Sequence, residues 1–356
     1  MARSRFLLNS PGILFAMGSA ILFGASTPMA KLLLGKGVDA WLLAGLLYFF
    51  SGLGLAVILV GRRLLNIRRT EAPLRRADLP WLASAILAGG IVGPVLLMFG
   101  LAGTQASTAS LLLNLEGLTT MLIAWIVFRE NADARILLGA VAILVGAGLL
   151  SWQGGPGGIG WSALAITGAC IAWAIDNNLT RKISSGDPVQ IAMLKGLVAG
   201  AINLVLGFAN HAALPQFGLL VGAALIGFFG YGVSLVLFVL ALRHLGTART
   251  GAYFATAPFV GTLIAVTVLS EPTSARLVAA AVLMAIGLWF HLTESHEHRH
   301  RHEPDDHEHL HSHDLHHKHQ HGRADPLGVP HTHRHAHKPI LHAHPHYPDL
   351  HHRHRH

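Results

Sequence analysis

Charged side chains are scarce in this chain. They make up 12% of its 356 residues, whereas a soluble domain has about 25%. Hydrophobic residues reach 52%, a balance that excludes an ordinary soluble domain and is typical of a membrane protein. Cysteine is almost absent: Cys170 stands alone in an apolar run, which excludes an intrachain disulfide, and we interpret it as a small core residue.

Acidic residues are rarer still in the apolar part. Of the nine Asp and Glu residues before Thr293, only Glu116 and Asp176 fall inside apolar runs. No phosphate-binding loop, spaced nucleophile or closed set of metal ligands appears, so the sequence supports neither an enzyme nor an ATP-driven pump. The basic residues lie in short loops and a tail, and the high pI is therefore not interpreted as nucleic-acid binding.

Long apolar runs fill most of the chain and are joined by short turns. Runs of about 19 to 26 residues have the length that a bilayer demands of a helix. The sequence therefore predicts an all-α membrane protein with ten transmembrane helices. The predicted spans are Gly12 to Leu34, Ala40 to Val60, Leu79 to Ala102, Gln105 to Phe128, Ala134 to Trp152, Ile159 to Thr180, Pro188 to Ala209, Phe217 to Leu242, Thr247 to Ser270 and Ser274 to Leu292.

The loops between these spans differ in charge. If the N-terminus is cytoplasmic, the inner loops carry fourteen Lys and Arg residues and the outer loops carry three, which are Lys31, Lys36 and Arg276. This asymmetry predicts that both termini are cytoplasmic.

The two halves of the apolar part resemble each other. Leu122 and Leu263, and Glu130 and Glu271, are matching pairs at one constant offset. Five spans in each half is an odd number, so the second half enters the membrane in the opposite orientation, which predicts an inverted repeat. We expect a first five-helix repeat over residues 1–152, a second over 153–293 and a tail over 294–356.

Glu116 is the strongest functional candidate, because it lies about half-way along its predicted span. A carboxylate at that depth costs at least ~2.5 kcal/mol if it faces lipid, so it is expected to face the bundle interior or a water-filled cavity. Thr119 and Thr120 follow at helical spacing on the same face. The alternative is a polar contact that only holds helices together.

Further polar residues sit in other spans. Asp176 and Asn177 lie near the cytoplasmic end of the sixth span, and Lys195 has a similar depth in the seventh, so an Asp176–Lys195 ion pair is expected. Its alternatives are a purely structural pair or side chains that reach to the cytosol. Ser26 and Thr27 precede Pro28 in the first span. A proline there frees a backbone carbonyl, which either takes part in a site or only accompanies a bend in the helix. We predict a transport cavity formed by Glu116, Thr119, Thr120, Asp176, Asn177, Lys195, Ser26 and Thr27.

The tail holds all but three of the 26 histidines and has no hydrophobic periodicity, so it is predicted to be disordered. Its H-x-H and H-H spacings suit Ni²⁺, Co²⁺, Cu²⁺ or Zn²⁺, held interchangeably rather than in one fixed geometry. The alternative is a solvated or pH-sensitive tail without a metal. The predicted ligands are His298, His300, His302, His307, His309, His311, His313, His316, His317, His319, His321, His331, His333, His335 and His337.

Several stretches resemble the drug/metabolite transporter superfamily, EamA type. They are FGASTPMAKLL from Phe23 to Leu33, LLLNLEGLTTMLIAWIVFRE from Leu111 to Glu130, and SEPTSARLVAAAVLMAIGLW from Ser270 to Trp289. Gly117 stands where family members usually have proline, so the resemblance does not decide whether the helix is kinked beside Glu116. With its histidine-rich tail, the chain also resembles the nickel-resistance efflux permeases, and this resemblance implies Ni²⁺ as first cargo and Co²⁺ as second.

Three functions compete on these grounds. The first is a secondary exporter of divalent metal cations in the bacterial inner membrane, driven by proton antiport at Glu116, with the tail collecting or sensing metal. The second is an exporter of a small organic metabolite or amino acid with an incidental tail. The third is a membrane-tethered metal buffer. We expect no permanently bound cofactor, lipid as the surrounding partner, no nucleic acid, and leave a homodimer open.

Overall fold

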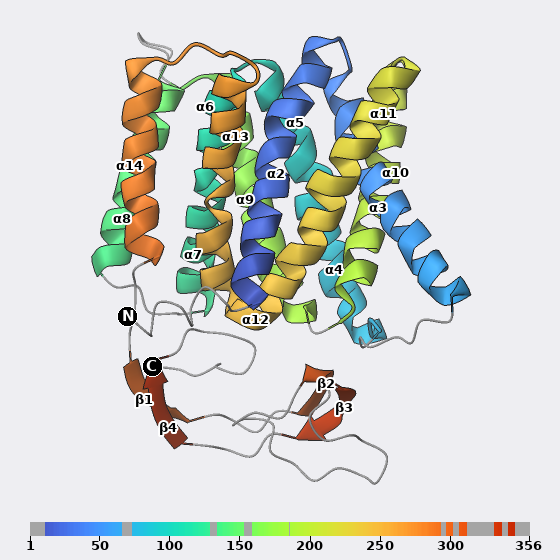
Figure 1. Cartoon of the computed structure of the whole chain (residues 1–356), viewed down its shortest axis with the longest axis vertical. Helices are drawn as coiled ribbons and strands as arrows, with labels where there is room; N and C mark the ends of the chain where they lie inside the picture. Colours follow the sequence, from blue (N-terminus) through green and yellow to red (C-terminus); the bar gives the residue numbers. More distant parts are fainter. Residues whose placement is uncertain are drawn as a thin grey trace.

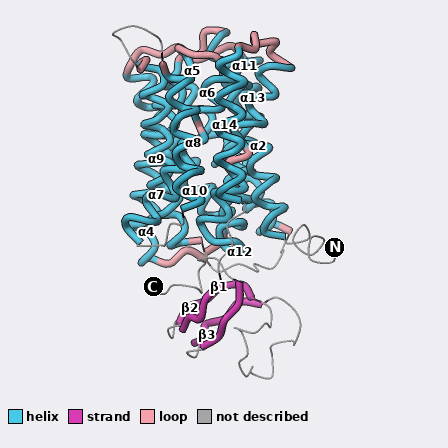
Figure 2. Tube along the Cα trace, turned by 90° about the vertical axis from the view of Figure 1, so that its left-hand side faces the viewer, coloured by secondary structure: helices cyan, strands magenta, loops and turns pink. Residues whose placement is uncertain are grey.

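The computed structural model describes residues 11–65, 73–128, 134–152, 159–184, 186–292, 297–301, 306–311, 331–336 and 341–345. Its helices run along one bundle, and four short strands lie beyond the end where α2 begins and α14 ends (Figures 1 and 2). The helices of the first half are α2 (Pro11–Gly35), α3 (Ala40–Leu64), η1 (Arg76–Asp78), α4 (Leu79–Ala85), η2 (Ile86–Val92), α5 (Gly93–Ala102), α6 (Ala106–Leu112), α7 (Asn114–Phe128) and α8 (Ala134–Ser151). Those of the second half are α9 (Trp161–Ile183), α10 (Pro188–Ala209), α11 (Phe217–Ile226), η3 (Gly227–Val233), α12 (Ser234–Phe254), α13 (Ala257–Thr267) and α14 (Ala275–Leu292).

Within the described residues, seven helical stretches are long and apolar enough to cross a membrane, and the protein is a multi-pass membrane protein. Two shorter apolar helices, Leu137–Ser151 and Ala275–His291, accompany them. α9 has 23 residues, but it carries Asp176, Asn177, Asn178, Arg181 and Lys182, so its composition is more polar than that of the others. The expected count of ten transmembrane helices therefore stays a prediction.

Polar caps explain where two of the helices begin. The Asp39 carboxylate accepts a hydrogen bond of 2.9 Å from the Leu42 amide at the start of α3. Asp187 does the same for the first amides of α10, where Pro188 occupies the first turn. Both caps satisfy amides that a helix leaves without an intrahelical partner.

Two segments of π-helix interrupt the bundle at related positions. η2 and η3 each contain seven residues, and they lie 141 positions apart, which is the offset between Glu130 and Glu271. A second pair of breaks follows the same offset: α6 gives way to α7 at Leu113, and α12 ends at Phe254. The helix therefore breaks before Glu116 although Gly117 replaces the proline.

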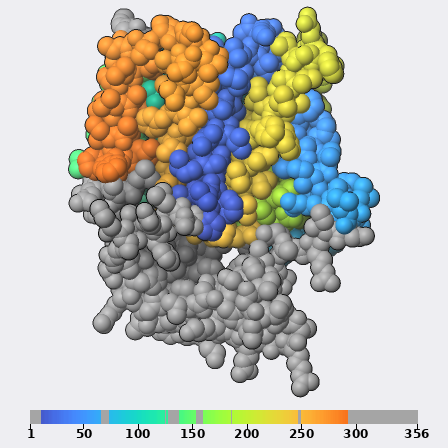
Figure 3. Space-filling model, viewed as in Figure 1, coloured from blue at the N-terminus to red at the C-terminus, as the bar shows by residue number. Residues whose placement is uncertain are grey.

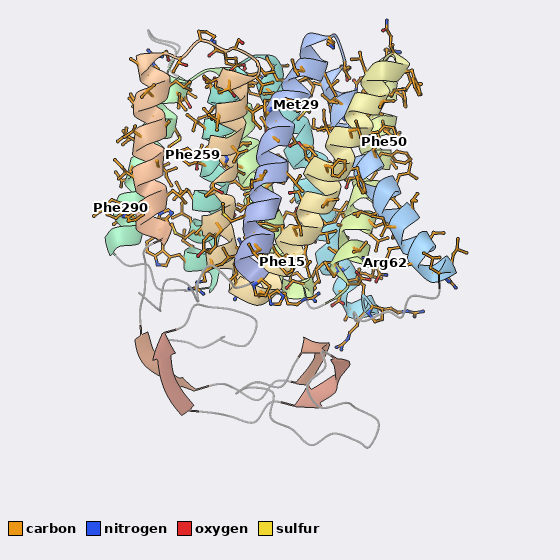
Figure 4. All side chains as sticks on the ribbon, in the orientation of Figure 1. Phe15, Met29, Phe50, Arg62, Phe259 and Phe290 are labelled. Atoms are coloured by element: carbon orange, nitrogen blue, oxygen red, sulfur yellow. The ribbon has the colours of Figure 1, made fainter. Side chains whose placement is uncertain are left out.

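Neighbouring helices come mostly from opposite halves of the chain. α3 packs along α10, α8 along α14, and α2 along both α12 and α13. In Figure 3, α2 forms a blue band between the orange surface of α13 and α14 and the yellow surface of α11 and α12. Figure 4 places Phe15 and Arg62 at the end of the bundle nearer the strands and Met29 toward the other end. The basic end of α3 thus lies on the side of the histidine-rich segment.

The histidine-rich segment corrects one expectation. Instead of lacking regular structure throughout, it contains the strands β1 (Glu297–Arg301), β2 (Asp306–His311), β3 (His331–Ala336) and β4 (Leu341–Pro345). β1 pairs with β4 and β2 with β3, both antiparallel. The H-x-H alternation that was interpreted as low complexity also has the two-residue period of a strand.

Candidate functional site

Glu116 lies in the first turn of α7 and is buried, with 6% of its surface exposed. Its carboxylate accepts a hydrogen bond of 2.9 Å from the Asn177 side-chain amide on α9. The same amide donates to the Thr120 hydroxyl at 3.3 Å, one turn along α7. Asn177 therefore holds the carboxylate and the hydroxyl in one polar group between two helices.

This polar group faces a small cavity that has room for about one water molecule. The cavity is lined from α2, α7, α9, α12 and α13, together with the turns beside them, by Phe23, Leu113, Glu116, Gly117, Thr120, Asn177, Phe238, Gly251, Phe254, Ala255, Ala257 and Pro258. Glu116 is the one ionisable side chain of this lining. The arrangement places a single carboxylate opposite apolar and aromatic walls.

Three phenylalanines make up the aromatic wall. Phe23 and Phe254 have ring centroids 5.2 Å apart, and Phe238 packs edge-on against Phe254 at 4.9 Å. Phe23 also makes edge-on contacts with Trp173 and Tyr231. Edge-to-face contact of the Phe238–Phe254 kind is a favoured arrangement of aromatic rings, so one side of the cavity is a packed aromatic wall.

Asp176 and Lys195 form the expected ion pair, at a place outside the cavity lining. The Lys195 ammonium lies 2.6 and 2.7 Å from the two Asp176 carboxylate oxygens, and both side chains are almost fully buried. Lys195 also donates to the Thr180 hydroxyl, which itself donates to Asp176. The two charges neutralise each other within one hydrogen-bonded group.

The ion pair packs against η2. A side chain on Gly89 would overlap the Asp176 carboxylate, so only glycine lets η2 approach α9 this closely. The Gly89 carbonyl accepts hydrogen bonds of 2.8 Å from the Tyr48 hydroxyl and from the Trp173 indole. Asn203 donates to the Gly90 carbonyl at 3.1 Å. These side chains supply donors to carbonyls of the π-helical segment, which commonly marks functional positions.

The remaining predicted site residues lie elsewhere. Thr119 donates to the Leu115 carbonyl of its own helix at 2.6 Å. Ser26 donates to the Phe23 carbonyl at 2.6 Å, and Thr27 is buried at 0% exposure. None of the three lines the cavity. Their part in transport stays a prediction, as does that of the other residues.

Sequence reasoning had not singled out the aromatic wall for the site. Phe23 begins the FGASTPMAKLL stretch, and Phe254 stands 141 residues after Leu113, another lining residue. The repeat offset of 141 residues, which relates Leu113 to Phe254, was the signal in the sequence that could have pointed to Phe254.

Metal ligands do not gather in the described helical part. No three His, Cys, Asp or Glu residues lie close enough to hold an ion among the described side chains. In the strands, register places His298 opposite His344, His309 opposite His333, and His311 opposite His331. His300, His307 and His335 also lie on strands. His302, His313, His316, His317, His319, His321 and His337 lie outside the described residues.

A membrane-spanning bundle with two related halves and an interior cavity defines a membrane transporter. The chain belongs to the EamA-like transporter family, whose model matches it twice, over residues 10–152 and 160–293.

Curated relatives agree with this assignment. An uncharacterized transporter of Methanothermobacter thermautotrophicus is 28% identical over 299 residues, covering 78% of this chain and 85% of the relative. The uncharacterized transporter YyaM of Bacillus subtilis is 25% identical over 289 residues, covering 76% and 90%. A solved structure titled "Crystal structure of protein" matches with a TM-score of 0.61 at 18% identity, covering 79% of this chain and 95% of that one, which shows the shared fold.

Proposed function

We propose that this transporter exports a cation that binds at Glu116, with Ni²⁺ as the first candidate and Co²⁺ as the second. The observation that carries the proposal is the charge of the cavity. Lys195 neutralises Asp176 outside the lining, whereas Glu116 faces the cavity with the neutral Asn177 side chain as its hydrogen-bond donor. A single carboxylate in an apolar surrounding attracts a cation or a proton.

Competition between these two ligands supplies the coupling. A proton that enters from outside neutralises Glu116 and releases the cation, and loss of the proton to the cytoplasm restores the site. Asn177 positions the carboxylate in both steps by its 2.9 Å hydrogen bond. The proposed driving force is therefore the proton gradient, and the proposed location is the bacterial inner membrane with both termini in the cytoplasm.

Ni²⁺ ranks first because of the tail, which holds 23 of the 26 histidines. Imidazole is a ligand that suits Ni²⁺, Co²⁺ and Zn²⁺. The tail would collect the ion on the cytoplasmic side and raise its concentration near the cavity. In the cavity, Glu116 and the hydroxyl of Thr120 offer oxygen ligands, a weak donor set that permits release.

A small organic cation is the second candidate, and the aromatic wall favours it. An ammonium group beside Phe23, Phe238 or Phe254 gains cation–π attraction of about 0.5–2 kcal/mol. In this case Glu116 would still provide the charge, and the tail would be incidental.

Everted membrane vesicles with an imposed proton gradient test the proposal. Uptake of Ni²⁺ and Co²⁺ is measured beside uptake of a tetraalkylammonium probe, for the parent protein and for Glu116→Gln. We expect the parent to take up Ni²⁺ and Glu116→Gln to lose at least ~100-fold, because the amide keeps the shape and cannot exchange a proton.

Thr167→Val is the matched control, since Thr167 lies on α9 outside the cavity lining and donates to the Ala163 carbonyl of its own helix. It is expected to transport at the parent rate. If the vesicles take up the ammonium probe but neither Ni²⁺ nor Co²⁺, the cargo is an organic cation and not a metal ion. If Glu116→Gln takes up metal at the parent rate, Glu116 has no part in the mechanism.

A further inference from the structure

At the end of the bundle opposite the strands, two side chains fasten the turn between α5 and α6. The Lys31 ammonium on α2 donates to the carbonyls of Leu101 and Ala102 at 2.7 and 3.1 Å. The Glu271 carboxylate, which follows α13, accepts from the amides of Ala106 and Ser107 at 2.8 Å each. The last carbonyls of α5 and the first amides of α6 thus bind two charged side chains, one from α2 and one from the segment after α13.

Glu271 is held in place by its own backbone. Ser270 has a φ of 54°, and the Glu271 amide donates to the Ala265 carbonyl at 3.2 Å. A left-handed residue at this point ends a helix and redirects the chain. This turn directs Glu271 from the end of α13 toward the start of α6.

Below this contact the bundle is closed. Glu116 lies ten residues along the chain from Ala106, or about 15 Å along the helices. Between them, a Cβ on Gly261 of α13 would lie 2.6 Å from the Ser110 hydroxyl of α6 and 2.8 Å from the Gly24 carbonyl of α2. Three helices therefore touch between the contact and the cavity.

The cavity lies on the other side of this closure. Its lining residues on α13 are the first two, Ala257 and Pro258, at the end of α13 farther from Glu271. Its lining residue on α9 is Asn177, which lies near the C-terminal end of that helix, since α9 ends at Ile183. The described conformation is thus closed between the cavity and the end that carries Glu271.

We infer that Glu271 is the latch of this closed end: its bonds to Ala106 and Ser107 hold α13 to α6, and they break when cargo leaves on that side. The inference rests on the proposed function only in that the protein alternates access to one cavity. Glu271 and Lys31 are only partly buried. Water therefore replaces their hydrogen bonds at modest cost, as a reversible contact requires.

Thiol labelling tests the latch without any cargo. In a Cys170→Ala background, Ser110→Cys places one thiol on α6 between the latch and the cavity, where the parent side chain is 1% exposed. A membrane-impermeant maleimide is applied to right-side-out and to inside-out vesicles. The side opposite the tail is identified by protease protection of the tail.

With Glu271 intact, we expect slow labelling from that side. Glu271→Gln loses the charge on the acceptor of two hydrogen bonds, which shifts the closed-to-open ratio by roughly tenfold, and labelling from that side rises by a similar factor. Glu271→Asp keeps the charge on a shorter side chain and is expected to fall between the two.

Arg276→Gln is the matched control, because Arg276 lies near the same end and donates to the Trp152 carbonyl at 2.8 Å without joining α13 to α6. It should label as the parent does. Equal labelling rates for parent and Glu271→Gln overturn the latch, and so does a variant that only loses thermal stability. If Glu271→Gln fails to accumulate, Glu271→Asp decides by the same comparison.

Discussion

Asp176 and Lys195 carry opposite charges into the interior of the bundle, where each has the other as its main electrostatic partner. Lys195 is 1% exposed and Asp176 5%. A buried pair gains little over an apolar pair of the same volume, but the loss of one member leaves a buried charge without its partner, at a cost of about 3–5 kcal/mol. We therefore propose a structural role for this pair, with Glu116 as the charge that a cargo would meet.

This role predicts a specific mutant pattern. Asp176→Asn and Lys195→Met should each lower the melting temperature of the purified protein in detergent, whereas the double variant should recover most of the loss, because it removes both charges together. Lys182→Met is the control, since Lys182 is exposed and stacks on Trp81 at 3.8 Å. Single variants that stay as stable as the parent but stop transport would instead place the pair in the site.

At the scale of the secondary-structure element, helix α3 packs on α10 through glycines. A Cβ on Gly196 would lie 2.5 Å from the Gly52 amide nitrogen and 2.7 Å from the Gly52 Cα. Small residues that bring two backbones this close are a common means of helix association in membranes, where van der Waals packing replaces the hydrophobic effect. The two helices cannot keep their separation if either glycine gains a side chain.

We therefore expect Gly196→Ala to destabilise the protein by about 1–3 kcal/mol, the usual cost of overpacking. Thermal unfolding in detergent, followed by the amount of monodisperse protein, measures this. Gly148→Ala is the matched control, because a Cβ there meets nothing within 4 Å on an exposed part of α8. A variant at Gly196 that behaves like the one at Gly148 would show that the two helices separate without cost.

The sequence predicted elements whose cause is local. The apolar runs, the caps at Asp39 and Asp187, and the offset between Glu130 and Glu271 can all be found without coordinates. The π-helical segments could not be predicted, because a helix with one extra residue per turn has the same apolar composition as an α-helix. In η2, donors from other helices accompany the segment, such as Tyr48 and Trp173 on the Gly89 carbonyl, and these partners depend on the packing.

The candidate site shows the same division. Glu116 was predicted from its depth alone, and Thr120 from helical spacing, but which neighbours face them depends on the packing of α2, α9, α12 and α13. Phe23 and Phe254 are ordinary apolar residues in the sequence and become a wall only when these helices meet. Thr119 shares the predicted stripe and still bonds its own helix instead.

At the scale of the whole molecule, the transmembrane bundle and the histidine-rich segment are two parts with different chemistry. The last helix of the bundle, α14, ends at Leu292, and all the predicted metal ligands follow it. The bundle should therefore assemble without the tail, and the two parts can be tested separately.

Truncation after Leu292 is expected to leave export intact and to lower resistance at low metal load, where capture of the ion limits the flux. A full-length variant with every tail histidine changed to glutamine keeps the length and loses the ligands, and it should match the truncation. Growth of a bacterium without its own efflux systems, across a nickel and cobalt series, measures both against the parent and against Glu116→Gln. Metal tolerance that is the same for all four proteins at every load would remove metal as the cargo and leave the organic cation.

Because protons compete for imidazole, the purified tail should bind Ni²⁺ at about pH 7.5 and release it below about pH 6, near the unperturbed histidine pKa of ~6.5.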